Sequence, residues 1–151
     1  MQRNGFLIAR NHLTVPNLSS DTLENTPTGL LSATTVSKVY TVAAMLGGQD
    51  DIGVVKIKDY IQKPKENGYR SFHMIVEVPV FFSNEKNDVR VEVQLRTIAM
   101  DFWATLEHGI KYKKEIADSA AIVAELKDCA EQVYALDTRM QSLRDRIRGA
   151  K

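Results

Sequence analysis

The sequence contains a single cysteine, Cys129, among 151 residues, and it has no apolar run long enough to span a bilayer. A lone cysteine cannot form an internal disulfide, which is typical of proteins from a reducing compartment. The apolar run at residues 6–9 is too short for a signal-peptide core or a transmembrane helix. We therefore expect a cytoplasmic protein with no membrane partner, and we interpret Cys129 as a small core residue rather than a nucleophile.

The sequence also lacks an excess of charge of either sign. Its 20 Lys and Arg residues oppose 19 Asp and Glu residues, for a formal net charge of +1. This balance gives no general attraction to DNA, so we expect no DNA partner, and any basic site must be local. There is no Walker A loop, no Gly-x-Gly-x-x-Gly, no Cys-x-x-Cys and no Ser-His-Asp order. The length and the 44% hydrophobic content suit one soluble domain with a single core.

The chain divides into three parts. Residues 1–35 are rich in Ser, Thr, Asn and Pro and show no sustained period, so we expect this segment to be poorly ordered. Residues 36–48 place apolar side chains at helical spacing, and the pair Gly47–Gly48 ends the predicted helix. The middle of the chain indicates strands, and residues 98–147 indicate helices.

The predicted strands begin with residues 52–57, and a basic loop follows them. From Phe72 to Val80 the apolar and polar positions alternate, and they alternate again from Val89 to Arg96, after a predicted hairpin turn at residues 83–88. Each of these two strands therefore has an apolar face and a polar face. On this pattern His73 lies on the same side as Glu92 and Gln94, which suggests a site.

The helical part predicts two helices. The first runs from residue 98 to about 110, and Thr97 is its expected N-cap. Its expected apolar stripe consists of Ile98, Ala99, Phe102, Trp103, Leu106 and Ile110. Asp118 or Ser119 is expected to cap the second. Its apolar residues repeat every seven positions: Leu126, Cys129, Val133, Leu136, Met140, Leu143 and Ile147. This pattern is typical of a helix that packs lengthwise on another helix, either as an internal brace or, as we favour, as a subunit contact.

The basic loop is the first candidate site. It carries Lys56, Lys58, Lys63, Lys65 and Arg70, with a tight turn expected at residues 67–68. A solvated loop is the simpler interpretation. Tyr69, between a glycine and an arginine, also suits a site that stacks a base and binds phosphates, although a ring folded over the hairpin is equally compatible.

Glu92 is the second candidate. A carboxylate within a valine-rich strand is costly unless it is solvated, paired or bound to a cation. It is placed either to pair with Arg90, Arg96 or His73, or to line a pocket where it holds Mg²⁺ or accepts a hydroxyl proton. Gln94, with a donor and an acceptor, suits recognition of a ribose or a base edge.

Residues 103–108 offer weaker candidates. We expect Glu107 and His108 to be an exposed pair near a helix end rather than a set of ligands, and we expect Trp103 to lie in the core. The residues taken alone therefore predict a nucleotide- or polyphosphate-binding face of a sheet with a possible metal-binding carboxylate.

Two segments together resemble a known family: KDYIQKPKENGYRSFH (58–73) and VEVQLRTIAMDFWATLEHGIKYK (91–113). They resemble the synthetase domain of RelA/SpoT-type (p)ppGpp synthetases, and with the heptad helix after them they are similar to the small alarmone synthetases. The resemblance implies an α+β fold of nucleotidyltransferase type, with a mixed β-sheet flanked by helices and a long C-terminal helix. It also implies transfer of pyrophosphate from ATP to the 3′-hydroxyl of GTP or GDP, with Mg²⁺, in the stringent response.

The resemblance also implies roles for individual residues. Tyr69 would stack on guanine, and Lys58, Lys65, Arg70 and His73 would meet the phosphates and sugar of the acceptor. Glu92 would be the catalytic, metal-linked carboxylate, and Gln94 would support the acceptor. Assembly into a homotetramer through C-terminal helices is a further implication.

Residues 1–48 depart from the family pattern, because they lack its segments Arg-x-Lys-x-x-x-Ser-x-x-x-Lys and Asp-x-x-Gly-x-Arg, which serve ATP. We therefore expect residues 1–35 to be a non-family segment, residues 36–115 an N-terminally incomplete synthetase domain holding the acceptor half, and residues 116–151 an oligomerisation helix. The alternative to an active GTP pyrophosphokinase is a noncatalytic remnant that binds guanine nucleotides or forms oligomers.

Overall fold

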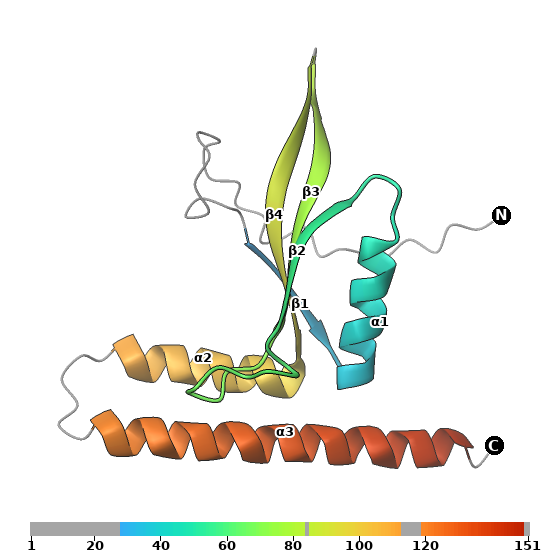
Figure 1. Ribbon diagram of the computed structural model, residues 1–151. Coiled ribbons are helices and arrows are strands. Elements are labelled where there is room, and N and C mark those ends of the chain that lie inside the picture. Colours follow the sequence, from blue (N-terminus) through green and yellow to red (C-terminus); the bar gives the residue numbers. More distant parts are fainter. Residues whose placement is uncertain (1–27, 84, 113–118, 150–151) are drawn as a thin grey trace.

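A computed structural model of the protein describes residues 28–83, 85–112 and 119–149 (Figure 1). Its elements are β1 (Thr28–Ala33), α1 (Val36–Gly47), β2 (Gly53–Asp59), β3 (Phe72–Phe82), β4 (Glu85–Thr97), α2 (Ile98–Tyr112) and α3 (Ser119–Gly149). The four strands form one sheet in the order β1-β4-β3-β2. Strand β1 pairs with β4 in parallel and the other pairs are antiparallel, so the expected mixed sheet with helices is confirmed.

Strand β1 corrects one prediction. We expected residues 1–35 to be poorly ordered, yet residues 28–33 form a strand whose register runs from Thr28 opposite Glu92 to Ala33 opposite Thr97. Its burial pattern shows no regular alternation, and the neighbouring Leu30 and Leu31 are both exposed. The sequence therefore lacks the alternation of apolar and polar residues by which a strand is predicted. Residues 1–27 lie outside the described residues.

The core lies on one face of the sheet, where the alternating apolar residues of β3 and β4 meet α1. Phe72, Met74, Val76 and Leu95 cluster with Val39 of α1, as the alternation predicted. Figure 1 shows α1 alongside the sheet and α2 and α3 side by side across one end of it. The opposite face of the sheet keeps the polar residues of β3 and β4.

The β3–β4 hairpin extends beyond the other strands (Figure 1). Its turn is shorter than the predicted residues 83–88, because Phe82 already pairs with Glu85. Strand β2 accompanies β3 only as far as Glu77, and β1 accompanies β4 only from Glu92 onward, so the outer hairpin is a two-stranded ribbon.

Helix α2 begins where predicted. The backbone N–H of Met100 donates to the Thr97 hydroxyl at 3.1 Å, which is the contact expected of an N-cap. The predicted apolar stripe was partly wrong, because Ile98, Phe102 and Leu106 are exposed. Trp103 is buried as expected, and its indole N–H donates to the carbonyl of Leu126 on α3 at 2.8 Å.

Helix α3 begins at Ser119. Of its two predicted caps, Ser119 is therefore the first residue of the helix, and Asp118 lies outside the described residues. One side of it braces the domain through Ala130, Tyr134 and Asp137. The second half of the heptad pattern is exposed, at Leu136, Met140, Leu143 and Ile147. Cys129 is also exposed, so its interpretation as a core residue was wrong. None of the described helices has the length and hydrophobicity needed to cross a membrane.

Candidate functional site

The loop between β2 and β3 is built on Asp59. One carboxylate oxygen accepts the backbone N–H groups of Ile61 and Gln62 at 2.9 and 3.0 Å, and the other accepts the Tyr40 hydroxyl at 2.9 Å. Ile61, at 1% exposure, anchors the start of the loop in the core. The Asp59 carboxylate therefore holds the start of the loop to its own backbone and to Tyr40, and this fixes the position of the loop residues that follow.

The predicted turn at residues 67–68 is confirmed. The Gly68 N–H donates to the Lys65 carbonyl at 2.8 Å, and the Lys65 N–H donates to the Tyr69 carbonyl at 3.1 Å. Gly68 has φ of +90°, which favours glycine, and a Cβ there would lie 2.6 Å from the Cβ of Ala130. Asn67 accepts the Tyr69 N–H at 3.1 Å, so the turn sets where the Tyr69 ring lies.

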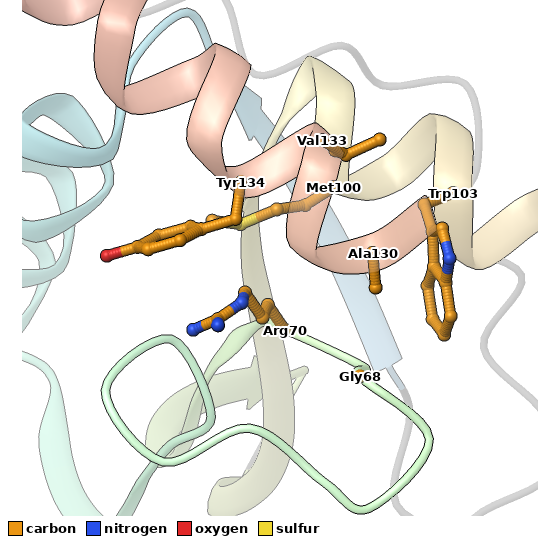
Figure 2. A pocket seen from close by; sticks show the side chains of 7 residues that line it. All are labelled: Gly68, Arg70, Met100, Trp103, Ala130, Val133 and Tyr134. Atoms are coloured by element: carbon orange, nitrogen blue, oxygen red, sulfur yellow. The ribbon is translucent and has the colours of Figure 1, made fainter. Parts of the chain in front are cut away.

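Arg70 joins the loop to α3 instead of reaching the polar face. Its guanidinium lies 3.9 Å from the Tyr134 ring centroid, donates to the Ile61 carbonyl at 2.6 Å and pairs with Glu131 at 3.2 Å. Figure 2 shows Arg70 beside Tyr134, in a hollow whose other lining residues come from the loop, α2 and α3. The structure therefore places Arg70 apart from the other predicted site residues, as a packing contact.

His73 and Glu92 are brought together as the strand pattern predicted, and Tyr69 of the loop joins them. His73 Nδ1 lies 2.8 Å from Glu92 Oε1, and His73 Nε2 lies 2.9 Å from the Tyr69 hydroxyl. Gln94 is the ladder partner of His73 on β4, and Lys58 is its partner on β2. These five side chains lie on one face of the sheet or at its end, and we call them the polar-face cluster.

Arg96 is a member of this neighbourhood that the sequence did not single out. We expected it only as one possible partner of Glu92, yet it donates to the Tyr69 hydroxyl and to Gln94 Oε1, each at 2.7 Å, and to Asp101 Oδ1 at 3.0 Å. The only signal in the sequence was its place on the polar side of the alternating strand. Glu92 pairs with His73, and Arg90 pairs with Glu77.

The lysines supply positive charge around the cluster. Lys65 Nζ lies 5.0 Å from the ring centroids of both Tyr60 and Tyr69. Lys58, like Lys56 and Lys63, is exposed. Because these flexible side chains flank an aromatic ring, they are suited to an anionic ligand that also carries a base.

Burial lowers the pKa of His73. The positive charges of Arg96 and Lys65 act in the same direction, whereas the Glu92 carboxylate opposes them. The imidazole is therefore neutral at pH 7, where one nitrogen donates and the other accepts.

The described residues contain no group of three His, Cys, Asp or Glu side chains arranged to hold a metal ion. One carboxylate oxygen of Glu92 is hydrogen-bonded to His73, and the other makes no hydrogen bond within the described part of the chain. Magnesium is commonly held by one or two carboxylates together with substrate phosphates, and Glu92 fits that kind of site.

The pair at residues 107–108 differs from expectation. Glu107 is buried at 8% exposure and accepts the Asn67 side-chain amide at 3.0 Å, so it supports the turn that carries Tyr69. His108 is exposed as expected. Glu107 lies one helical turn after Trp103 and so faces the same way as that buried ring, and this spacing was the sign in the sequence that Glu107 is buried.

Comparison with known proteins identifies the family. Residues 30–117 match the region found in RelA/SpoT proteins, so the match includes part of β1 and all the polar-face cluster. The chain is 46% identical over 112 residues to GTP pyrophosphokinase YwaC of Bacillus subtilis, and the alignment covers 74% of this chain and 53% of that protein. It is 36% identical over 116 residues to GTP pyrophosphokinase YjbM of the same organism, covering 77% and 55%.

Solved structures agree with this family. The crystal structure of small alarmone synthetase 2 from Bacillus subtilis has a TM-score of 0.74 and 42% identity, covering 79% of this chain and 65% of that one. Small alarmone synthetase 1 from Bacillus subtilis, bound to its product pppGpp, has a TM-score of 0.73 and 35% identity, covering 78% and 61%. The chain spans about half the length of the curated relatives it matches. With the family region matching more than half of its residues, this protein belongs to the RelA/SpoT family.

Proposed function

We propose that this chain takes part in (p)ppGpp synthesis as a GTP pyrophosphokinase, with GTP or GDP as acceptor, ATP as donor and Mg²⁺ as cofactor. The observation that carries the proposal is the continuous contact from Tyr69 through His73 to Glu92 on a polar sheet face, in a chain of this family. Two relatives named as GTP pyrophosphokinases and a similar structure bound to pppGpp support it. The cytoplasm is the proposed location.

The acceptor nucleotide would bind at the polar-face cluster. Tyr69 would stack on guanine, and a base on the face near Lys65 would displace that ammonium group toward the phosphates. Lys58 is an exposed neighbour of His73 and would meet the phosphates or sugar. The amide of Gln94 would donate to the acceptor, and His73 would orient Glu92 through the 2.8 Å contact.

The chemical step would be a displacement at the β-phosphorus of ATP. The acceptor 3′-hydroxyl oxygen forms a bond to that phosphorus while the bond from phosphorus to the α,β-bridging oxygen breaks, and AMP leaves. Glu92 takes the hydroxyl proton, since a carboxylate near the nucleophile is a general base. Glu92 would also hold Mg²⁺, which when bound supplies positive charge to the transferred phosphates.

The decisive experiment incubates the purified chain with labelled ATP, GTP and Mg²⁺, with Glu92→Gln as the matched control. We expect labelled pppGpp from the wild type and a loss of on the order of 100-fold or more in the control, the usual worth of a general base. Calorimetric titration of GTP measures acceptor binding separately. GTP binding without any product would show the noncatalytic nucleotide-binding alternative, and neither binding nor product would refute both.

We also propose that α3 assembles the protein into a homo-oligomer, with a tetramer as the expected form. The large apolar residues that the second half of α3 leaves uncovered are Leu136, Met140, Leu143 and Ile147, exposed by 59%, 57%, 42% and 70%. They follow a heptad spacing, which suits a second helix laid along the first. A continuous exposed apolar seam is uncommon on soluble monomers, which supports a shared interface.

A further inference from the structure

Arg96 is the one cation that donates hydrogen bonds to two members of the polar-face cluster within the described part of the chain. Its side chain is only 12% exposed, and its two terminal nitrogens reach Tyr69, Gln94 and Asp101 at 2.7–3.0 Å. Asp101 lies in the first turn of α2, so it fixes the guanidinium from the end of the sheet. Arg96 is thereby held in place while it contacts two residues of the site.

The chemistry of a guanidinium gives these hydrogen bonds a direction. A guanidinium only donates, so the Tyr69 oxygen must accept from Arg96. The proton of Tyr69 is then available for His73 Nε2, which lies 2.9 Å away. The ionised Glu92 carboxylate can only accept, so the imidazole proton resides on Nδ1 and is donated to Oε1 at 2.8 Å, which leaves Nε2 as the acceptor for Tyr69.

The same argument orients Gln94. Its oxygen accepts from Arg96, so its amide NH₂ group faces away from the guanidinium. That group makes no hydrogen bond within residues 28–83, 85–112 and 119–149. The two N–H bonds of the Gln94 amide are thus turned outward on the polar face, where they can donate to a bound ligand.

We propose that Arg96 is a positioning residue: from the end opposite Glu92 it sets the direction of the hydrogen bonds that run from Tyr69 through His73 to Glu92, and it turns the Gln94 amide outward as a donor to the acceptor nucleotide. The identity of that nucleotide rests on the proposed function. The direction of the hydrogen bonds is a property of the chain alone and is measurable without any ligand.

The charges that face His73 agree with a neutral, single-tautomer imidazole. Arg96 acts on it from β4 and Lys65 from the loop, Glu92 is the opposing carboxylate, and Lys58 is the exposed ladder partner of His73 on β2. The positive charges of Arg96 and Lys65 disfavour a second proton on the ring, and the single carboxylate at Nδ1 favours the proton there. The pKa of His73 is lowered accordingly, with burial as the main cause.

The test is nitrogen NMR of the ligand-free, ¹⁵N-labelled full chain at a pH where His73 is neutral. The ring signals are assigned by their loss in His73→Gln. We expect Nδ1 to be protonated and Nε2 unprotonated in the wild type. Arg96→Met keeps the length of the side chain and removes every donor, and Tyr69→Phe removes only the hydroxyl. Both weaken or remove the hydrogen bond from Tyr69 to Nε2, so both should move the Nε2 signal toward that of an unprotonated nitrogen without a hydrogen bond.

Arg90→Met is the matched control, because Arg90 lies on the same strand and contacts Glu77 rather than His73. It should leave the ring signals unchanged. A wild-type proton on Nε2 would overturn the inference, as would unchanged ring signals in a folded Arg96→Met. If Arg96→Met does not fold, Tyr69→Phe decides, and unchanged ring signals there would equally overturn it.

A kinetic measurement connects this inference with the reaction. In a chain that transfers pyrophosphate, Arg96→Met should lower kcat/KM for GTP on the order of 10–100-fold, the range known for residues that orient metal-binding histidines, while Arg90→Met should not. Absence of transfer in the wild type would refute the proposed activity and leave the tautomer result standing, so the two failures are distinguishable.

Discussion

His73 on β3 and Glu92 on β4 touch across the sheet at 2.8 Å, although they are diagonal rather than direct ladder partners. The direct partner of His73 is Gln94, and that of Glu92 is Ile75. A diagonal pair on one face of an antiparallel ladder is within reach of two longer side chains. This contact makes a buried imidazole the neighbour of the proposed catalytic carboxylate, and it has consequences that are measurable in solution.

The first prediction is a pH dependence of stability from His73. Because burial lowers its folded pKa below the ordinary value of 6.5, the unfolded chain binds a proton that the folded chain does not bind between those two values. The free energy of unfolding should therefore rise with pH up to about 6.5 and gain nothing further from His73 above it. Urea unfolding of His73→Gln should lose this rise, whereas His108→Gln, at an exposed position, should keep it.

The second prediction separates the ring of Tyr69 from its hydroxyl. If the ring stacks on guanine, Tyr69→Ala should weaken GTP binding by roughly 1–3 kcal/mol, as measured by calorimetry. Tyr69→Phe keeps the ring and should bind GTP nearly as well, but it loses the contacts to His73 and Arg96 and should lower kcat. Equal losses of GTP affinity in the two variants would contradict stacking.

The third prediction concerns the close approach of the loop to α3. Gly68→Ala should lower the free energy of unfolding by about 1–3 kcal/mol for its positive φ and by about 1–3 kcal/mol more for the 2.6 Å approach to Ala130. Ala130→Gly alone should cost about 1 kcal/mol of helix stability. The double variant removes the clash, so it should be more stable than the sum of the two single losses implies. Strictly additive losses would show that the clash does not exist in solution.

The fourth prediction concerns Asp137, whose buried carboxylate accepts the hydroxyl of Thr97. Burial raises the pKa of Asp137, so the folded chain binds a proton that the unfolded chain lacks from pH 3.8 up to the raised value. The free energy of unfolding should fall with rising pH across that interval, and Asp137→Asn should abolish the fall while keeping an acceptor for Thr97. Asp137→Ala leaves that hydroxyl without its partner and should cost about 1–3 kcal/mol at neutral pH.

The fifth prediction tests the exposed seam of α3. Leu136→Asp combined with Leu143→Asp should give a smaller species than the wild type in light scattering, because burying each such leucine contributes roughly 1.5–3 kcal/mol. Ser142→Asp, at a neighbouring exposed position of α3, is the matched control for added charge and should leave the mass unchanged. A wild-type monomer at micromolar concentration would exclude the interface.

Much of the fold was predictable because its signals are local. The alternation in β3 and β4 predicted which face carries His73, Glu92 and Gln94, and the threonine before α2 predicted its N-cap. Strand β1 was not predictable. It is short, its larger apolar residues are exposed, and it is held by pairing with β4, which lies about sixty residues later in the chain.

The sequence by itself determined which residues share a face, because strand and helix periods are properties of the backbone, and it determined the family through two segments of unusual composition. Only the tertiary structure decided what each face meets. It directed Arg70 onto Tyr134 and Glu131, left Phe102 exposed, buried Glu107 against Asn67, and placed Arg96 between Tyr69 and Asp101. The reason is physical: a long charged side chain takes the partners that three-dimensional packing brings into contact with it, and the partners of Arg70 and Arg96 just named lie 5 to 64 positions away in the chain.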